Sequence, residues 1–446
     1  MIRAKRLLIF FIPIMIIFLI FSDHFKLILQ EKIFNQKNLE ISQLQNKLSS
    51  IQSSINKINS YELDLRLKES QKPLYFKYSE KVKFSEYELK IFKPEINILS
   101  SGINNRFPGS AYLENHGSKL ILVSSIGIIA FAENIDDNLH FEQISNNVND
   151  FLKIESLKKE NWFSIKDVLI DKKYIYLSYS NEIKPDCWNT SIIRGKFNVN
   201  HIVFESFFSP EECASAEIAL INGEDKHQFN AHQSGGRMIA YNKNYIIFST
   251  GDYRNRFNSQ KNDNHLGKII LINKQDSSYK IISKGHRNPQ GLYLHQNKII
   301  SSEHGPQGGD EINLIDLRQD MILNYGWPIS SYGEHYGGRI QENFDLYQIY
   351  ELKKSHKEFG FIEPLKYFNP SIGPSEISYF HNKFFLGSMK AKSLYTFTLD
   401  KNQKIENFEK FYIGERIRDI TLHKDRKKLL LFLEDSASIG VLGINE

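Results

Sequence analysis

Two clusters of charged, glycine and proline residues lie close together in residues 285–313, GHRNPQGLYLHQNKIISSEHGPQGGDEIN. They occupy 286–291 and 303–311, and two apolar runs joined by the polar turn 295–298 separate them. Such a hairpin brings both clusters to the same end of its strands. Because loops on a rigid scaffold commonly carry ligands, the clusters predict a binding site there.

A second pair of candidate residues stands in residues 230–255, NAHQSGGRMIAYNKNYIIFSTGDYRN. His232 opens one apolar run and Asp252 closes the next, so the two side chains can meet at one end of a hairpin. A histidine oriented by a carboxylate is a common general base, because its pKa lies near neutrality. An isolated His and Asp in loops more often only cap turns.

The elements that must position these residues are short β-strands. From about residue 96, apolar runs rich in Ile, Tyr, Phe, Leu and Val alternate with tight polar turns. A unit of strand, polar turn and strand recurs around 241–252, 292–303, 379–388 and 421–435. This repetition predicts an all-β propeller, whose central channel would gather loops that are distant in sequence. A large β-sandwich is the alternative, but it gives no reason for the repetition.

The N-terminal residues have a different character. Residues 7–21, LLIFFIPIMIIFLIF, are uncharged and follow three basic residues, which predicts an export signal with its N-terminus inside. No small-x-small cleavage site follows, and FKLIL extends the apolar run. An uncleaved membrane anchor over residues 1–29 is therefore favoured over a cleaved signal peptide.

A heptad pattern follows this anchor. Phe34, Ile41, Leu48 and Ile55 are seven residues apart, with polar residues between them. The pattern predicts a coiled coil over 30–60 and a homo-oligomer, and the alternative is a single amphipathic helix on the membrane or the domain. Residues 61–95 are aperiodic and are interpreted as a linker, with the propeller domain at 96–446.

Charge and cysteine content limit the function classes further. The net charge of +5 is small, and basic and acidic residues are interspersed, so no nucleic-acid partner is expected. The two cysteines, Cys187 and Cys213, can form one disulfide in an exported chain, and two free buried thiols are the alternative.

Six motifs stand in an order that resembles the soluble quinoprotein glucose dehydrogenases and the wider family of pyrroloquinoline quinone (PQQ)-dependent aldose and sorbosone dehydrogenases. They are HQSGGR…STGD, GHRNPQGL, SEHGPQGGDEINLI, NYGWPISSYG, GSMKAKSLY and RIRDI. The resemblance covers about residues 100–444 and is strongest from 230 to 333. It implies a six-bladed β-propeller.

The resemblance also implies a role for each matching residue. His232 would be the base for the sugar's anomeric hydroxyl, with Asp252 as the acid beside it and Arg287 at the reactive carbonyl of the quinone. The remaining implied residues bind PQQ or calcium: Arg287, Asn288, His304, Lys390, Arg416 and Arg418 for PQQ, and the backbone carbonyls of Gly305 and Pro306 for calcium.

These residue types suit the implied ligands. PQQ carries three carboxylates, so its pocket must present fixed cations, and Arg offers a planar fork to a carboxylate. Calcium binds hard oxygen ligands, including backbone carbonyls. Its charge would polarise the quinone carbonyl toward hydride.

Three stretches differ from the family pattern. Trp162 or Phe163 stands near the place of a substrate-contacting Gln, and Asn369 stands where the glucose-oxidising enzymes have a Trp. After NYGWP, the chain also lacks the acid expected for a second, structural calcium site. Glucose itself is therefore not the expected substrate.

The sequence as a whole predicts a quinoprotein that oxidises an aldose-type sugar to its lactone. It would be anchored in the bacterial inner membrane by one span, with the propeller in the periplasm and an electron acceptor in the same compartment. The alternative is a non-enzymatic propeller that binds a glycan or a protein partner outside the cytoplasm.

Overall fold

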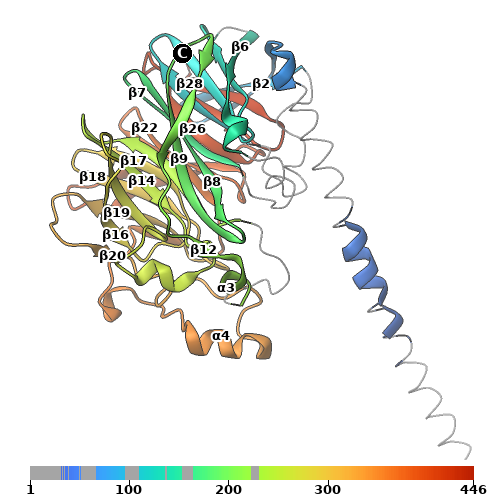
Figure 1. Cartoon of the computed structure of the whole chain (residues 1–446), viewed down its shortest axis with the longest axis vertical. Coiled ribbons are helices and arrows are strands. Elements are labelled where there is room, and N and C mark those ends of the chain that lie inside the picture. Colours follow the sequence, from blue (N-terminus) through green and yellow to red (C-terminus); the bar gives the residue numbers. More distant parts are fainter. Residues whose placement is uncertain are drawn as a thin grey trace, which may run out of the picture. The chain divides into compact units, whose positions relative to one another are not determined.

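The computed structural model describes residues 32, 34, 36–38, 40–49, 51, 67–95, 110–135, 138–152, 164–221 and 231–445 (Figure 1). The chain divides into two compact units, residues 1–56 and 57–446. In the first unit, the described residues between Lys32 and Ile51 are helical, and the apolar heptad side chains among them are exposed. These residues are helical as expected, and the coiled coil over 30–60 stays a prediction.

The predicted membrane anchor at residues 1–29 lies outside the described residues. Within the part of the chain that the structure describes, no helix has both the length and the apolar character needed to cross a membrane.

The second unit is built almost entirely of antiparallel strands. Four sheets in the middle of the chain each hold four consecutive ladder strands. These sheets are β7 (Ile165–Asp171), β8 (Tyr174–Lys184), β9 (Cys187–Lys196) and β11 (Phe204–Phe208); β13 (Gly235–Ala240), β14 (Tyr245–Thr250), β15 (Lys268–Asn273) and β16 (Tyr279–Lys284); β17 (Pro289–His295), β18 (Lys298–Glu303), β19 (Asp310–Asp316) and β21 (Lys366–Phe368); and β22 (Pro374–Phe380), β23 (Lys383–Ser388), β24 (Ser393–Leu399) and β25 (Ile405–Tyr412).

Two further four-stranded sheets contain the ends of the domain. They are joined through β1 (Leu74–Phe84), which pairs with both β2 and β6. Their strands are β3 (Ala111–His116), β4 (Lys119–Ser124), β5 (Ile129–Ala132) and β6 (Asn138–Asn146), and β26 (Ile417–Leu422), β27 (Leu429–Leu433), β28 (Ser438–Ile444) and β2 (Tyr87–Pro94).

Short elements complete the described fold. They are the two-residue strands β10 (His201–Ile202), β12 (Ala214–Ser215) and β20 (Leu323–Asn324), the helices α3 (Ala216–Ile221) and α4 (Phe344–Ile349), and the 3-10 turns Val148–Asp150, Arg256–Gln260, Gln341–Asn343 and Lys357–Phe359.

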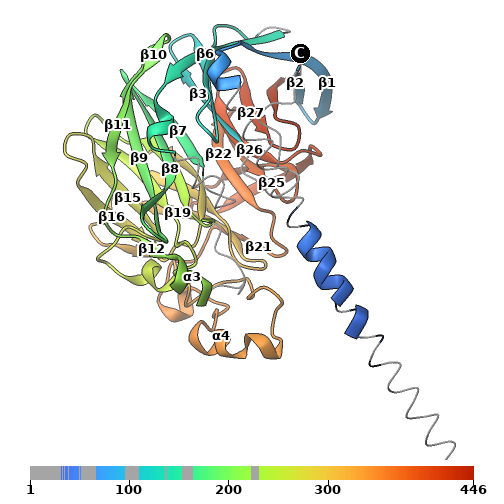
Figure 2. The ribbon, with the colours of Figure 1, turned by 45° about the vertical axis from the view of Figure 1, so that its right-hand side comes forward.

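The six sheets form a closed ring (Figure 2). Their first strands contact one another in the cyclic order β3, β7, β13, β17, β22, β26 and back to β3. This is the blade arrangement of a β-propeller, and it confirms the predicted all-β class. The expected linker at 61–95 is wrong for β1 and β2, because alternate apolar side chains such as Leu89 and Ile91 pack into the core while β2 pairs with β28.

Apolar side chains fill the space between neighbouring sheets. Between the sheet of β7–β11 and the sheet of β13–β16, Tyr176 and Phe208 pack with Phe248, Ile270 and other buried residues. Each such side chain contributes about 1.5–3 kcal/mol of burial free energy. The alternation of the sequence therefore specifies which face of each strand is covered.

A buried ion cluster on Arg237 joins the sheets where their inner strands meet. The Arg237 guanidinium lies 2.7 Å from Asp419, 3.0 Å from Asp167 and 3.1 Å from Glu376. It also donates to the carbonyl of Gln290 at 2.8 Å.

The carboxylates of this Arg237 cluster bind backbone amides as well. Asp419 accepts from the backbone N–H of Leu113, and Asp167 accepts from that of Met238, each at 2.7 Å. Together with the bonds of Arg237, the cluster connects residues of β3, β7, β13, β17, β22 and β26.

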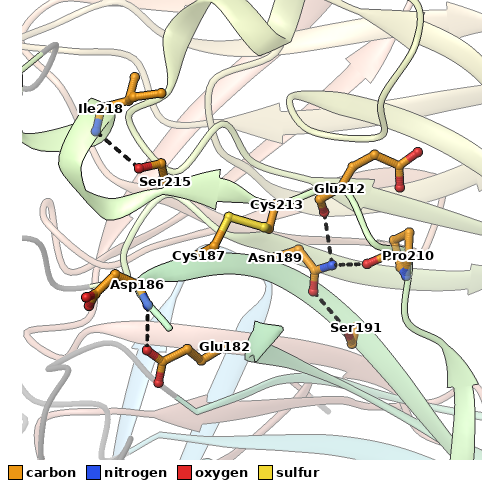
Figure 3. Close-up of a disulfide and its surroundings, with 10 residues drawn as sticks. All are labelled: Glu182, Asp186, Cys187, Asn189, Ser191, Pro210, Glu212, Cys213, Ser215 and Ile218. Carbon is orange, nitrogen blue, oxygen red and sulfur yellow. Dashed lines mark hydrogen bonds between the residues drawn. A yellow bond between two sulfur atoms is a disulfide. The ribbon is translucent and has the colours of Figure 1, made fainter. Parts of the chain in front are cut away.

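The two cysteines form the predicted disulfide (Figure 3). Cys187 begins β9, and Cys213 precedes β12, which pairs with the same strand. Their Cα atoms are 5.4 Å apart across 26 residues of sequence. Asn189 supports the same loop by donating to the carbonyls of Pro210 at 2.7 Å and Glu212 at 3.1 Å. The alternative of two free thiols is therefore excluded in this structure.

Candidate active site

The inner strands carry irregularities at corresponding positions. The register shifts between Ile165 and Asp167 in β7, between Pro289 and Gly291 in β17, and between Ile417 and Asp419 in β26. β-Bulges of this kind redirect a side chain and are common beside active sites.

The residues at these three bulges are Lys166, Gln290 and Arg418. Arg418 donates from Nη1 to Oε1 of Gln290 at 3.3 Å, although the two residues belong to different sheets. The bulges therefore bring polar side chains of separate blades together.

A cavity of about 200 Å³ lies near this point. Three of the side chains that line it are cations: Arg287, Lys390 and Arg416. The other lining residues are His304, Gly305, Pro306, Gln307, Asp310, Tyr336, Ser371, Gly373 and Met389. Six residues from the predicted set, Arg287, His304, Gly305, Pro306, Lys390 and Arg416, are thus brought to one cavity.

Arg416 and Arg418 share one carboxylate. Arg416 Nε lies 2.9 Å from Glu434, and Arg418 Nε lies 2.6 Å from the other oxygen of the same group. Ser110 donates to Glu434 as well. These cations hold the pKa of Glu434 at about 2 in spite of its burial, which alone would raise it. Arg418 is buried and does not line the cavity, so Arg416 is the member of this group that a ligand can reach.

The loop that begins at Gly305 is held by a buried carboxylate. Asp310 accepts from the backbone N–H groups of Gly305 at 2.9 Å, Ile372 at 2.7 Å and Gly373 at 2.8 Å. Burial raises the pKa of Asp310 to about 6, and these amides oppose that shift. A Cβ on Gly305 would lie 2.1 Å from the carbonyl oxygen of Gly309, so only glycine fits this tight loop.

Within the described residues, no group of three or more His, Cys, Asp or Glu side chains is placed to hold a metal ion. The predicted calcium ligands are instead the backbone carbonyls of Gly305 and Pro306, two residues that line the cavity. Backbone carbonyls are hard donors of the type that calcium takes. The cations of the cavity are likewise of the type that binds the carboxylates of PQQ.

His304 is fixed as a neutral donor at the cavity wall. Its Nε2 lies 2.8 Å from the carbonyl oxygen of Pro374. Burial, with Arg287, Arg418 and Arg416 nearby, lowers the pKa of His304 to about 3. An uncharged imidazole can donate only from the nitrogen that carries the proton, so the other nitrogen stays an acceptor.

Asp252 is oriented by residues other than His232. Its carboxylate accepts from Nε1 of Trp327 at 2.7 Å and from the side-chain amide of Gln233 at 2.8 Å. The carbonyl oxygen of that Gln233 amide accepts from Arg287 at 3.0 Å. Burial raises the pKa of Asp252 to about 6, which Arg287 and Trp327 partly offset.

His232 has an arginine as its partner. Arg254 donates from Nε to Nε2 of His232 at 2.7 Å, and the backbone N–H of Arg254 bonds Asp252 at 2.9 Å. The expected contact between Asp252 and His232 is therefore replaced by a link through Arg254. Burial, Arg254, Arg287 and Lys166 together hold the pKa of His232 well below its ordinary value, so the ring is neutral.

Asn288 is a supporting residue rather than a part of the cavity wall. Its Oδ1 accepts from the backbone N–H of Gly235 at 3.1 Å and from Gln290 at 3.0 Å, and its carbonyl accepts from the backbone of His304 at 3.1 Å. Asn288 thereby connects the sheet that begins with β13 to the sheet that begins with β17, beside Arg287.

Several residues of the site are absent from the sequence prediction: Lys166, Gln233, Arg254, Trp327 and Tyr336. Arg254 stands two residues after Asp252, and its partnership with His232 depends on a left-handed backbone at Tyr253 and Arg254 (φ 49° and 65°) that no simple pattern predicts. Trp327 belongs to the NYGWP turn. It supports both Asp252 and Arg287, whose guanidinium lies 5.5 Å from its ring centre.

Comparison with known proteins identifies the family of the chain. Residues 165–441 match the model of the Glucose / Sorbosone dehydrogenase family. Aldose sugar dehydrogenase YliI of Escherichia coli is 28% identical over 229 residues, which cover 46% of this chain and 58% of that protein. Quinoprotein glucose dehydrogenase B of Acinetobacter calcoaceticus is 41% identical over 76 residues, 14% of this chain and 15% of that protein.

The chain spans about six tenths of the length of the curated relatives slr1608 of Synechocystis and YliI. Among solved structures, the soluble aldose sugar dehydrogenase of Escherichia coli has a TM-score of 0.59 at 20% identity, covering 75% of this chain and 96% of that one. The PQQ-bound aldose sugar dehydrogenase of Streptomyces coelicolor has a TM-score of 0.56 at 15% identity, covering 84% and 99%. These likenesses establish the propeller fold. The family match extends from β7 into β28, the last strand. The chain therefore belongs to the Glucose / Sorbosone dehydrogenase family.

Proposed function

We propose that this protein is a quinoprotein that oxidises an aldose-type sugar to its lactone, with PQQ as the hydride acceptor and calcium beside it. The observation that carries the proposal is the cavity where Arg287, Lys390 and Arg416 converge next to the loop of Gly305 and Pro306. Three cations match a cofactor with three carboxylates. The names of the relatives, which include an aldose sugar dehydrogenase and a quinoprotein, support the same chemistry.

The residues of the chain divide the work between binding and proton transfer. Arg287, Lys390 and Arg416 would hold PQQ, and the carbonyls of Gly305 and Pro306 would hold calcium. PQQ, when bound, supplies a two-electron acceptor for the hydride that leaves the anomeric carbon. His232 would take the proton of the anomeric hydroxyl on Nε2, so that the sugar loses one hydride and one proton in total. The lowered pKa keeps the His232 ring neutral, which is the state a base needs before it accepts a proton, and the Arg254 N–H must leave Nε2 for that step.

The test is a titration of the purified protein with PQQ in the presence of calcium, followed by reduction of a redox dye with a panel of aldoses. Binding at micromolar concentration corresponds to about 8 kcal/mol, and failure to bind at that level would refute the proposal. His232→Asn should still bind PQQ while turnover falls roughly 10²- to 10⁴-fold, the usual loss with a general base. His381→Asn, which changes an exposed turn histidine, is the matched control.

We also propose that the protein is held in the bacterial inner membrane by residues 1–29, with the propeller and its electron acceptor in the periplasm. The basic and apolar order of the N-terminus supports this. Cell fractionation should recover the full-length chain with the membrane. A soluble chain that begins near residue 23 would mean a cleaved signal.

A homo-oligomer through the N-terminal helix is part of the same proposal. Phe34, Leu44 and Leu48 are 65–67% exposed in the single chain, which leaves the heptad face available to a second copy. Sedimentation of the chain with and without residues 30–60 tests this, because a coiled coil predicts that the deletion yields monomers.

A further inference from the structure

Tyr336 lines the cofactor cavity, and the proposed function gives it no role. Within the described part of the chain, it is the one Phe, Tyr or Trp side chain among the lining residues. Tyr336 is 51% exposed, and among the described residues no other ring packs on its phenol and no group bonds its hydroxyl. An aromatic surface therefore borders the cavity without a partner in the described part of the chain.

The backbone on either side of Tyr336 is fixed to the wall of the cavity. Gln307 and Glu334 exchange two backbone hydrogen bonds of 2.8 Å, and Oε1 of Gln307 accepts from the backbone N–H of Gly337 at 2.9 Å. The side-chain amide of Asn343 donates to the carbonyl of Tyr336 at 2.9 Å. Gln307 itself lines the cavity, so the loop that would hold calcium also holds Tyr336 in place.

Close backbone packing also sets the position of Tyr336. A Cβ on Gly309, which has a φ of 67°, would lie 2.2 Å from the backbone nitrogen of Gly333. A Cβ on Gly333 would lie 2.4 Å from the carbonyl oxygen of Gly308. A side chain at either place would push the two segments apart. Because glycines and backbone bonds hold the segment, replacement of the Tyr336 side chain should leave the cavity intact.

The side chains of the lining differ in the part of PQQ that they suit. The three cations suit its carboxylates. The conjugated rings of PQQ need apolar contacts, and the apolar side chains of the lining are those of Pro306, Met389 and Tyr336. A planar aromatic ring gains from contact with a second aromatic ring beyond the area that is buried. Tyr336 is thus the lining residue that best matches the ring system of PQQ.

The sugar is the alternative partner for this ring. Its anomeric hydroxyl must reach Nε2 of His232 in the proposed reaction, and neither His232 nor Asp252 lines the cavity. Tyr336, in contrast, lines the same cavity as the cations and as the carbonyl-bearing loop of Gly305 and Pro306. The arrangement therefore favours the cofactor over the sugar.

We propose that Tyr336 is a cofactor-binding residue whose phenol ring packs against the conjugated rings of bound PQQ. This rests on the proposed function, because it adds a residue to that same site. The ring contributes apolar contact and covers the cofactor against water at the edge of the cavity. The hydroxyl has no part in the binding.

Titration of the full chain with PQQ in the presence of calcium measures the contribution of the ring. Tyr336→Leu removes the aromatic ring, and Tyr336→Phe removes only the hydroxyl. We expect Tyr336→Leu to weaken PQQ binding about tenfold and Tyr336→Phe to weaken it less than about threefold. Tyr412→Leu changes a tyrosine that is 70% exposed and outside the cavity lining, so this matched control should bind PQQ as the wild type does. Unchanged affinity in Tyr336→Leu, or an equal loss in Tyr336→Phe, would overturn the proposal.

The salt dependence of the same titration separates contact with the ring from a disturbance of the cations. PQQ affinity should fall as salt is raised, because carboxylates pair with cations in the cavity. Tyr336→Leu removes no charge, so its affinity should fall as steeply as that of the wild type, whereas Lys390→Ala should show a shallower dependence. If Tyr336→Leu instead shows the shallower dependence, Tyr336 acts by positioning the cations, and the ring contact is wrong.

Dye reduction at saturating PQQ tests the alternative partner. A raised KM for the sugar in Tyr336→Leu, together with wild-type affinity for PQQ, would assign the ring to the sugar and overturn the proposal. The two levels of inference fail in different ways. A wild type that binds no PQQ refutes the proposed function and the role of Tyr336 together, whereas PQQ binding that Tyr336→Leu does not weaken refutes the role of Tyr336 alone.

Discussion

Trp327 donates a hydrogen bond from its indole nitrogen to Asp252 at 2.7 Å, and the same ring faces the guanidinium of Arg287. Asp252 itself is fully buried. Asp252, which follows β14, therefore supports the Trp327 ring against which Arg287 packs, and among the described residues its link to His232 runs through Arg254. Asp252 is thus a positioning residue, and its effect on any reaction should pass through Arg287.

A double-mutant cycle with Asp252→Asn and Trp327→Phe tests this relationship. Because the bond is charge-assisted and buried, we expect a coupling of about 1–3 kcal/mol in the free energy of unfolding. Chemical denaturation of the four proteins measures it. The second cycle, Asp252→Asn with His232→Asn, serves as the comparison and should give a smaller coupling. The reverse order of the two couplings would contradict the assignment.

Lys390 gives the cleanest test of the cofactor cavity. Its side chain is exposed and lines the cavity, so Lys390→Ala removes a cation with little effect on packing. Loss of one charge-assisted hydrogen bond, about 1.5–3 kcal/mol, should weaken PQQ binding about 10- to 150-fold. Fluorescence or absorbance titration measures the change, with Lys401→Ala on a surface turn as the control. Unchanged affinity in Lys390→Ala would place PQQ elsewhere.

Arg418→Ala is a different experiment. Arg418 is buried against Glu434, so its removal leaves a buried carboxylate with fewer partners, and such changes cost about 3–5 kcal/mol of stability. Its effect on PQQ would be confounded with unfolding, which is why Lys390 is preferred.

The Cys187–Cys213 disulfide should contribute to stability through the unfolded state. A link across 26 residues restricts the unfolded chain by about 3–4 kcal/mol in the loop-entropy description. The double variant Cys187→Ser, Cys213→Ser should therefore unfold at lower denaturant concentration than the oxidised protein. Non-reducing peptide mapping should recover the two cysteines in one linked pair, and two alkylatable thiols in the native protein would disagree with the structure.

The Arg237 cluster predicts how stability depends on pH. Burial raises the pKa of Asp167 to about 7 and that of Glu376 to about 8, against the partly compensating charge of Arg237. A carboxyl with a higher pKa in the folded state binds more protons there than in the unfolded chain. Its stabilising contribution is therefore complete below about pH 4 and is lost as the pH rises through 7 to 8.

We expect these groups to make the free energy of unfolding fall between about pH 5 and pH 8. Denaturation curves at several pH values measure this slope. Glu376→Gln keeps the size of the side chain and removes one titrating group, so its slope should be shallower than that of the wild type. An identical slope in Glu376→Gln would show that another group controls the pH dependence.

The sequence predicts the blades better than it predicts the site. Runs such as 245–250 and 429–433 are mostly or entirely apolar, and burial of both strand faces follows from that pattern. The strands at 74–94 escaped prediction because their charged faces resemble a linker. They are recognisable as strands only through pairing with β28 and β6, which is non-local.

Motif order located the cations and the glycine loop, while the connections between them depend on three-dimensional detail. Arg254 reaches His232 because the loop after β14 turns through left-handed residues, and Lys166 stands at a bulge of β7. Neither event has a signature in residue type alone. Lys166 in particular stands in a strand where a lysine ordinarily faces solvent.

The pairing of β2 with β28 has a consequence for the order in which this protein can be made. The sheet of β26, β27, β28 and β2 contains residues 87–94 from the beginning of the domain and residues from 417–444 at its end. During synthesis, β2 is made long before its partner β28, and one edge of β2 stays unpaired until nearly the whole chain has followed. A truncated chain that ends before residue 417 would leave the edge of β2 unpaired and would leave the sheet of β22–β25 without its neighbour. Exposed strand edges promote aggregation. The ring is thus completed by its last strands, and early termination would leave an aggregation-prone chain with no closed channel in which to hold a ligand.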